Sequence, residues 1–282
     1  MKRTIIITGA TDGIGKQTAL ELAKQGFNLG LVGRNPEKGA SVVSELIRET
    51  GNESIQFHYA DLSIMESVQK LADEIQSSYE TIDVLLNNAG AYFSKLNMTD
   101  EGFEKTFALN HLAYFYLTTL LLEMVKNGNP GRIINVASTA HKNTELDFED
   151  IQGMNDYKGW PAYGRSKLMN IMFTYECHRR LGDTGVTFNC LHPGFVNSCF
   201  GNNNSGFARG SINLGKSIFA INVMRGAKTS VFLASADEVE GISGKYFDKC
   251  KAKKSSKVSY IEEDQKQLWE TTEDMIKSIQ IN

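Results

Sequence analysis

The sequence is short of cysteine, of proline and of excess charge, and each shortage excludes a class of protein. Its cysteines show neither a CxxC pair nor zinc-ligand spacing, and there are only four: Cys177, Cys190, Cys199 and Cys250. We therefore expect reduced, mostly buried thiols and no disulfide framework. Its four prolines form no linker, which favours a single domain over 1–282. A net charge of −3 gives no basic field of the kind that nucleic acid attracts.

Long apolar runs are also missing. The N-terminal run Ile5–Ile7 soon meets Gly9 and is too short for a signal peptide or a hydrophobic anchor. The stretch 114–125 is interrupted by Thr118, Thr119 and Glu123 and falls short of the ~20 residues that span a bilayer. We therefore expect a soluble, cytoplasmic protein with no transmembrane segment.

Metal-binding and membrane-binding patterns are weak. His111, His141 and His192 lack companion acids and ligand spacing, so we expect no metal site. The basic run from Lys249 to Lys257 is typical of a solvated face, and a contact with a membrane surface is the alternative.

Short β-rich runs instead alternate with segments whose apolar residues recur every three or four positions. The predicted strands are Thr4–Thr8, Asn28–Gly33, Ser54–Asp61, Val84–Ala89, Arg132–Ser138, Val186–His192 and Lys245–Phe247. This alternation is typical of βαβ units. We expect an α/β fold, a doubly wound Rossmann-type parallel sheet of about seven strands with helices on both faces.

Two irregular segments break the alternation, at about 141–160 and 195–219. Both follow the carboxyl ends of predicted strands, where open α/β sheets bind ligands. The second contains Phe195, Phe200, Phe207 and Phe219. These aromatic residues favour a substrate-covering loop over plain disorder.

The most informative pair is Tyr163 and Lys167, which lie four residues apart. On a helix this spacing places a phenol and an ammonium on one face. We expect the cation to lower the pKa of the phenol, which would make Tyr163 a usable proton donor or acceptor.

A glycine-rich turn, Gly9-Ala10-Thr11-Asp12-Gly13-Ile14-Gly15, closes the first predicted strand and opens the first helix. Such a turn lets backbone amides approach a pyrophosphate at the helix N-terminus. A tight βα turn without a ligand is the alternative. Asp12 stands where a basic residue would help to bind phosphate.

The end of the second strand reads Gly33-Arg34 and carries no acid. An acid there would hold the ribose 2′-hydroxyl of NAD, whereas an arginine accommodates the 2′-phosphate of NADP. Gly33 is expected to leave space and Arg34 to contact the phosphate. The sequence thus favours NADP(H), with an NAD-linked alcohol dehydrogenase as the alternative.

These motifs together resemble the short-chain dehydrogenase/reductase family. The matching segments, in order, are Thr8-Gly9-(x)3-Gly13-Ile14-Gly15, Asn87-Asn88-Ala89-Gly90, Asn110, Ser138, Tyr163-x-x-x-Lys167 and Pro193-Gly194. Segments 131–138, 163–170 and 268–270 are similar to the retinol dehydrogenase group and its relatives, which include the WW-domain oxidoreductase and protochlorophyllide reductase. The absence of a hydrophobic anchor argues against a retinoid substrate.

The resemblance implies a role for each of four catalytic residues. Tyr163 would give a proton to the carbonyl oxygen or take one from the alcohol. Lys167 would lower the pKa of Tyr163 and hold the nicotinamide ribose, and Ser138 would hydrogen-bond the substrate oxygen. Asn110 would hold a water that links Lys167 to solvent.

The resemblance also implies the cofactor contacts. Asp61 would accept a hydrogen bond from the adenine, with capping of the next helix as the alternative, and Ser198 would contact the carboxamide. The full set is Gly9, Thr11, Asp12, Gly13, Ile14, Gly15, Arg34, Asp61, Leu62, Asn88, Ala89, Gly90, Tyr163, Lys167, Pro193, Gly194, Val196 and Ser198.

The sequence therefore predicts an NADP(H)-dependent oxidoreductase that interconverts a lipophilic aldehyde or ketone and its alcohol. Besides the NAD-linked enzyme, the alternative from another class is a catalytically silent dinucleotide sensor or scaffold. The expected partner is a small molecule. A homo-oligomer is compatible with the sequence but not indicated by it.

Overall fold

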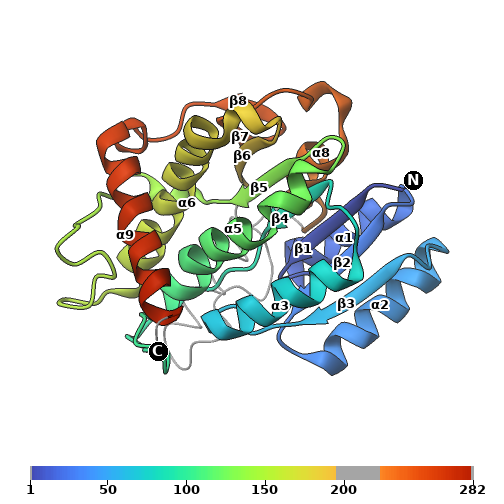
Figure 1. Cartoon of the computed structure of the whole chain (residues 1–282), viewed down its shortest axis with the longest axis horizontal. Coiled ribbons are helices and arrows are strands. Elements are labelled where there is room, and N and C mark those ends of the chain that lie inside the picture. Colours follow the sequence, from blue (N-terminus) through green and yellow to red (C-terminus); the bar gives the residue numbers. More distant parts are fainter. Residues whose placement is uncertain (1, 195–222, 281–282) are drawn as a thin grey trace.

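The computed structural model describes residues 2–194 and 223–280, which form one eight-stranded sheet with helices on both faces (Figure 1). The strand order is β3-β2-β1-β4-β5-β6-β7-β8. All neighbours are parallel except β7 and β8. The strands are β1 Thr4–Thr8, β2 Asn28–Gly33, β3 Ile55–Tyr59, β4 Val84–Asn87, β5 Arg132–Val136, β6 Thr187–His192, β7 Lys245–Asp248 and β8 Lys251–Lys253.

The longer helices of the described residues cross between the parallel strands or, in the case of α9, close the chain. They are α1 Gly13–Lys24, α2 Pro36–Thr50, α3 Met65–Ser78, α5 Ala113–Lys126, α6 Gly159–Leu181, α8 Val223–Ser235 and α9 Glu262–Gln280. Shorter helical turns are α4 Lys105–Phe107, the π-helical turn η1 Ala108–Leu112, and the 3₁₀ turns η2 Thr139–His141, η3 Gly182–Thr184, η4 Asp237–Val239 and η5 Lys257–Tyr260. The predicted α/β class and doubly wound sheet are confirmed.

Alternate residues of β1 supply the two apolar layers. Ile5 and Ile7 belong to a core with α1, α2 and α8, whereas Ile6 belongs to a core with α3, α5, α6 and α9. Successive strand side chains point to opposite faces, so a continuous apolar strand is stable only where helices cover both faces. This explains the unbroken isoleucine run of the first strand.

The sheet has one strand more than the expected seven. The additional strand, β8, pairs antiparallel with β7 at the edge, and its three residues are all exposed. Lys249 and Cys250 form the two-residue connection, with φ of 52° and 59°. Positive φ at both positions is typical of a tight hairpin turn. The basic run thus lies partly on an edge strand, where lysines discourage pairing with another chain.

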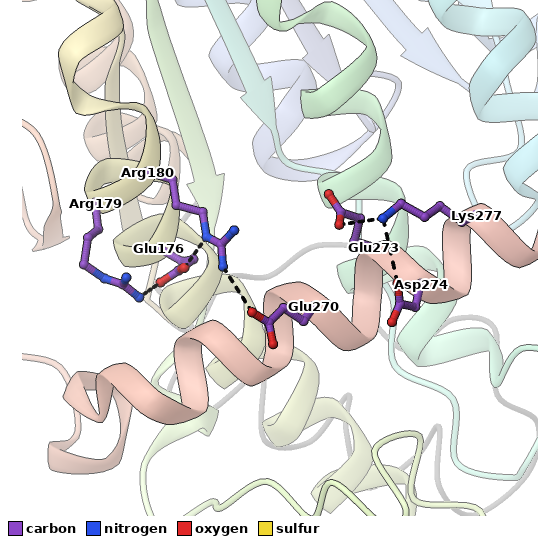
Figure 2. A network of polar contacts seen from close by, with 7 residues as sticks. All are labelled: Glu176, Arg179, Arg180, Glu270, Glu273, Asp274 and Lys277. Carbon is purple, nitrogen blue, oxygen red and sulfur yellow. Dashed lines mark hydrogen bonds and ion pairs between the residues drawn. The ribbon is translucent and has the colours of Figure 1, made fainter.

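The C-terminal helix α9 packs against α6, and a polar network lies along this contact (Figure 2). Glu176 is fully buried and pairs with Arg179 and Arg180, and Arg180 reaches Glu270 of α9 at 3.9 Å. The Arg180 guanidinium also lies 4.9 Å from the Trp269 ring centroid. The same residues therefore neutralise a buried charge and dock the last helix.

Of the two irregular segments, the first begins at the last residue of η2 and leads into α6, as expected from its place before the Tyr163 helix. The segment 195–219 lies outside the described residues. Within the described ranges, Cys177 and Cys190 are buried free thiols and Cys250 is partly exposed. No helix in those ranges is long and apolar enough to cross a membrane.

Candidate active site

The predicted site residues gather at the carboxyl edge of the parallel strands. From β1 the chain proceeds outward through β2 to β3, and it then returns to place β4 on the other side of β1. Parallel sheets bind ligands at such a switch point. The ends of β1, β4 and β5 lie side by side there and are followed by the glycine turn, Asn88 and Ser138.

Tyr163 and Lys167 share one buried face of α6, as their spacing predicts. The Lys167 Nζ lies 5.7 Å from the Tyr163 ring centroid and 5.5 Å from that of Tyr114. It donates a hydrogen bond to Val136 O at 2.9 Å, at the end of β5. The ammonium is thus held between two aromatic rings and a strand carbonyl.

The pKa of Tyr163 differs in direction from the expectation. Burial raises it to about 12, and a hydrogen bond with the Ser138 hydroxyl opposes that rise. Burial also lowers the pKa of Lys167, to about 7. Desolvation penalises the charged form of both groups and here outweighs the attraction between phenolate and ammonium.

Asn110 lies in the π-helical turn η1 and is fully buried. Its Oδ1 accepts from Ala91 N at 2.9 Å, and its Nδ2 donates to Ala91 O and to Ser166 Oγ, each at 3.0 Å. The amide therefore fixes the segment after β4 against α6. Its water-holding role stays a prediction.

Asn88 attaches the glycine turn to the end of β4. Its Nδ2 donates to Thr8 O at 2.8 Å and to Gly9 O at 3.3 Å. A Cβ on Gly15 would lie 2.2 Å from Gly9 O, and one on Gly9 would lie 2.8 Å from Ala89 Cα. Glycine is required at both positions because backbone passes where a side chain would lie.

The segment after β4 also passes beside Lys167. A Cβ on Gly90 would lie 3.3 Å from Lys167 Nζ and 3.2 Å from Asn110 Oδ1. The structure therefore brings the glycine turn, the segment 88–90, Asn110 and Lys167 into one continuous site.

Asp12 caps α1, because its Oδ1 accepts from Gly13 N at 2.7 Å. Its Oδ2 pairs with Lys38 of α2 at 2.5 Å, which offsets the negative charge that the sequence places in this turn. Lys38 thus joins the exposed Arg34 as a second basic residue near the tip of β2. Sequence reasoning missed it, because the pairing spans 26 residues.

The expectation that Gly33 leaves open space is wrong. A Cβ there would lie 2.7 Å from Thr11 Cγ2 and 3.3 Å from Phe57 Cε2. The missing side chain accommodates Thr11 of the glycine turn. Gly33 therefore packs two parts of the candidate cofactor site together.

Asp61 forms a local turn, in which its Oδ1 accepts from Ser63 N at 3.0 Å and from Ser63 Oγ at 2.7 Å. The capping alternative is wrong, because Ile64 is the N-cap residue of α3 and the first amides of that helix donate to Glu101. Leu62 belongs to the apolar core. The adenine contact of Asp61 stays a prediction.

Pro193 and Gly194 directly follow β6, and Gly194 has a φ of 86°. Val196 and Ser198 lie outside the described residues. Among the residues that are described, no group of three or more His, Cys, Asp or Glu side chains could hold a metal ion.

Two aromatic residues that sequence reasoning missed lie beside Tyr163. The Trp160 ring centroid is 5.7 Å from that of Tyr163, and the Tyr92 centroid is 6.5 Å from it. Trp160 is one turn earlier on α6 and is 50% exposed. The spacing of three residues between Trp160 and Tyr163 could have predicted that both side chains lie on the same face of α6.

Comparison with known proteins identifies relatives along most of the chain. The family model described as short chain dehydrogenase matches residues 3–206. Retinol dehydrogenase 13 of Homo sapiens is 40% identical over 273 residues, which cover 95% of this chain and 82% of that protein. Polyprenol dehydrogenase of Homo sapiens is 37% identical, with coverages of 95% and 83%.

A solved structure extends the comparison to three dimensions. A short chain dehydrogenase from Shigella flexneri 2a str. 301, complexed with NADP, has a TM-score of 0.68 and 25% identity. The alignment covers 88% of this chain and 97% of that one. The match therefore includes nearly the whole of the other fold.

Proposed function

The chain belongs to the short-chain dehydrogenase family, and from that premise we propose that it interconverts a lipophilic carbonyl compound and its alcohol with NADP(H). The observation that carries the proposal is the cluster of half-buried Ser138 with buried Tyr163 and Lys167 beside the switch point of the sheet. A positioned phenol and ammonium supply proton transfer and charge stabilisation. A pure dinucleotide sensor needs neither.

Tyr163 is the proposed acid and base. The nicotinamide supplies or accepts the hydride when the cofactor is bound. With a pKa near 12, the Tyr163 hydroxyl stays protonated at neutral pH and can donate to a carbonyl oxygen. Ser138 can hydrogen-bond the same oxygen and stabilise its developing charge. In the oxidative direction Tyr163 must lose its proton, which a charged Lys167 favours.

The carboxyl edge of the sheet fits a dinucleotide. The first amides of a helix have no intrahelical partner and attract a pyrophosphate, and α1 begins at Gly13, within the glycine turn. Gly9 and Gly15 let the backbone close up there. Lys167 would hold the nicotinamide ribose from the opposite end of the site.

NADP(H) is preferred in this proposal because the tip of β2 carries Arg34 and, nearby, Lys38. The tip of β2, Gly33-Arg34, carries no carboxylate that would repel a 2′-phosphate. The nearby carboxylate of Asp12 is paired with Lys38. The related Shigella flexneri structure is a complex with NADP. These observations support, by charge complementarity, a 2′-phosphate site at Arg34 and Lys38.

A lipophilic substrate is supported by the aromatic pair Tyr92 and Trp160. Their rings lie 6.1 Å apart and flank Tyr163, so an apolar chain can pack on them while its carbonyl faces the phenol. The names of the two human relatives, retinol dehydrogenase and polyprenol dehydrogenase, describe alcohols with long apolar chains.

The test is a panel of aldehydes and ketones, from short aliphatic to long isoprenoid, assayed with NADPH and with NADH. We expect turnover with kcat/KM at least about tenfold higher for NADPH, which is the contribution of one charge-assisted contact. Equal use of NADH would support the NAD-linked alternative. Dinucleotide binding without turnover of any carbonyl would support the silent sensor.

The substrate class has a separate test in Trp160→Ala. We expect kcat/KM to fall about 5- to 30-fold for long apolar aldehydes, because the substitution removes the apolar area on which the chain packs. A short aldehyde that cannot reach the ring is the internal control and should change less than about twofold. Equal losses for both would contradict a lipophilic site at Trp160.

A further inference from the structure

Two buried histidines lie on either side of the loop that carries Ser138, and the proposed chemistry does not use them. His141 ends the 3₁₀ turn η2, and His192 is the last residue of β6. Their side chains are 0% and 8% exposed. Both rings hydrogen-bond backbone groups, and three of these groups, Ser138 O, Thr139 N and Gly194 N, belong to segments that form the site.

The His141 ring connects Ser138 to a distant loop. Its Nε2 accepts from Ser256 N at 3.1 Å, and its Nδ1 lies 2.5 Å from Ser138 O. Because Nε2 is an acceptor, the proton of the neutral ring lies on Nδ1, which donates to Ser138 O. The ring also packs edge-on against Tyr246, with centroids 5.4 Å apart. This contact fixes its orientation.

His192 has the opposite tautomer. Its Nδ1 accepts from Thr139 N and from Gly194 N, both at 3.3 Å, so the proton of the neutral ring lies on Nε2. One ring nitrogen thus joins the residue after Ser138 to the Pro193-Gly194 turn. Burial lowers the pKa of His192 to about 4 and also lowers that of His141. Both rings are therefore neutral at neutral pH, as these roles require.

We propose that His141 and His192 are positioning residues for the reaction: together they fix the Ser138 backbone, and His192 also sets the Pro193-Gly194 turn against it. The Ser138 hydroxyl meets Tyr163 from a loop, not from a strand, so its position depends on what holds that loop. A displacement of about 1 Å at a catalytic group can cost about 100-fold in rate. The inference rests on the proposed function for its kinetic readout.

Replacement of His192 by Leu and by Asn tests whether its Nδ1, which accepts from both Thr139 N and Gly194 N, positions the site. Asparagine can place Oδ1 near the position of Nδ1, whereas leucine offers no acceptor. We expect His192→Leu to lower kcat at least about tenfold and to weaken the dinucleotide Kd about three- to tenfold. His192→Asn should stay within about threefold of wild type in both. A merely structural role would not produce this rescue when the two variants unfold at the same temperature.

Substitution of His141 tests the position of Ser138 separately from that of the Pro193-Gly194 turn, because the His141 ring hydrogen-bonds Ser138 O whereas Gly194 N donates to His192. His141→Leu should lower kcat to a similar extent and leave the dinucleotide Kd unchanged, and His141→Asn, which keeps a donor, should recover most of kcat. His178→Leu is the matched control. It replaces an exposed histidine on α6, and it should change neither quantity.

The outcomes distinguish this inference from the proposed function. If the wild type turns over no carbonyl, the proposed function fails, and the dinucleotide Kd still decides the role of His192. A wild-type Kd in His192→Leu then overturns the inference. If the wild type is active, equal kcat in the folded Leu variants overturns it as well.

Discussion

Tyr163 owes its proposed role to a single oxygen, and Tyr163→Phe removes that oxygen with little change in volume. We expect kcat to fall by about 10²- to 10⁴-fold, the usual contribution of a positioned general acid. The dinucleotide Kd should stay within about threefold of wild type, because the glycine turn and Lys167 remain. Initial rates with NADPH and fluorescence titration of the cofactor measure the two quantities.

Tyr175→Phe is the matched control on the same helix. It also removes a buried hydroxyl, one that hydrogen-bonds Ser255 Oγ at 2.8 Å and Tyr260 Oη at 3.3 Å. Its kcat should stay within about twofold of wild type. If Tyr163→Phe retained more than about a tenth of the activity, or if both variants lost activity equally, Tyr163 would not be the proton donor.

The proposed preference for NADPH over NADH also depends on single residues, Arg34 and Lys38. Arg34→Ala should reduce the ratio of kcat/KM for NADPH to that for NADH by about 10-fold or more, mainly through KM. The 2′-phosphate is remote from the reacting carbon, so its contacts contribute alike to the ground state and to the transition state. Lys38→Ala should act in the same direction, although it also removes the ion pair with Asp12.

Arg48→Ala is the control for that prediction, because it removes an exposed arginine in the last turn of α2. The NADPH-to-NADH ratio should not change in it. An unchanged ratio in Arg34→Ala, with wild-type NADPH affinity, would refute the assignment of the 2′-phosphate site.

The sequence predicted contacts between site residues that are close together along the chain, and it missed contacts between distant ones. Tyr163 and Lys167 are four positions apart on α6, so helical geometry alone placed them on one face. His192 and Thr139 are 53 positions apart, and their contact exists only because β5 and β6 are neighbours in the sheet. The upward pKa shift of Tyr163 depends on burial, which no spacing reveals.

At the scale of secondary-structure elements, local pattern again decided what was predictable. The bounds of β1 and β2 match the prediction, because apolar runs end there at a glycine turn or at a polar residue. β8 was missed because its three residues are exposed and rich in lysine, and only its hairpin with β7 makes it a strand. The π-helical turn η1 that holds Asn110 has no sequence signal that we could identify.

Glu176, on the helix that contacts α9, is neutralised by Arg179 and Arg180 (Figure 2). A buried charge that loses its partners costs about 3–5 kcal/mol, whereas replacement of the whole group by apolar residues is often neutral. We expect Arg179→Ala with Arg180→Ala to lower the free energy of unfolding by about 3 kcal/mol or more. The additional change Glu176→Leu should restore most of it. Urea denaturation measures all three proteins.

Lys277→Ala is the control on the same network, because it breaks only exposed pairs with Glu273 and Asp274. Such pairs contribute about 0–1 kcal/mol. If the triple variant were as unstable as the double variant, the loss would come from the contacts of Arg180 with Trp269 and Glu270, and not from the charge on Glu176.

At the scale of the whole molecule, the fold buries Tyr163 and Lys167 and thereby shifts the pKa of both. The central strands and the helices on both faces bring Lys167 to 3% exposure, although the same fold could be built with an apolar residue at this position. The chain thus keeps a cation where burial disfavours it. We expect Lys167→Met to abolish turnover, to weaken dinucleotide binding and to stabilise the fold by about 1–3 kcal/mol at pH 7.

The pH dependence of the stability gained in Lys167→Met shows whether the gain comes from removing a buried, titrating ammonium. Burial lowers the pKa of Lys167 from 10.5 to about 7, so between these values the unfolded chain binds the proton and the folded chain does not. The contribution of Lys167 to stability therefore rises with pH across this window and is least favourable below pH 7. The advantage of Lys167→Met should be largest at pH 6 and should shrink steadily towards pH 10. Urea denaturation of both proteins from pH 6 to pH 10 measures it. A constant advantage would mean that the variant gains from better packing, and that Lys167 keeps its charge at neutral pH.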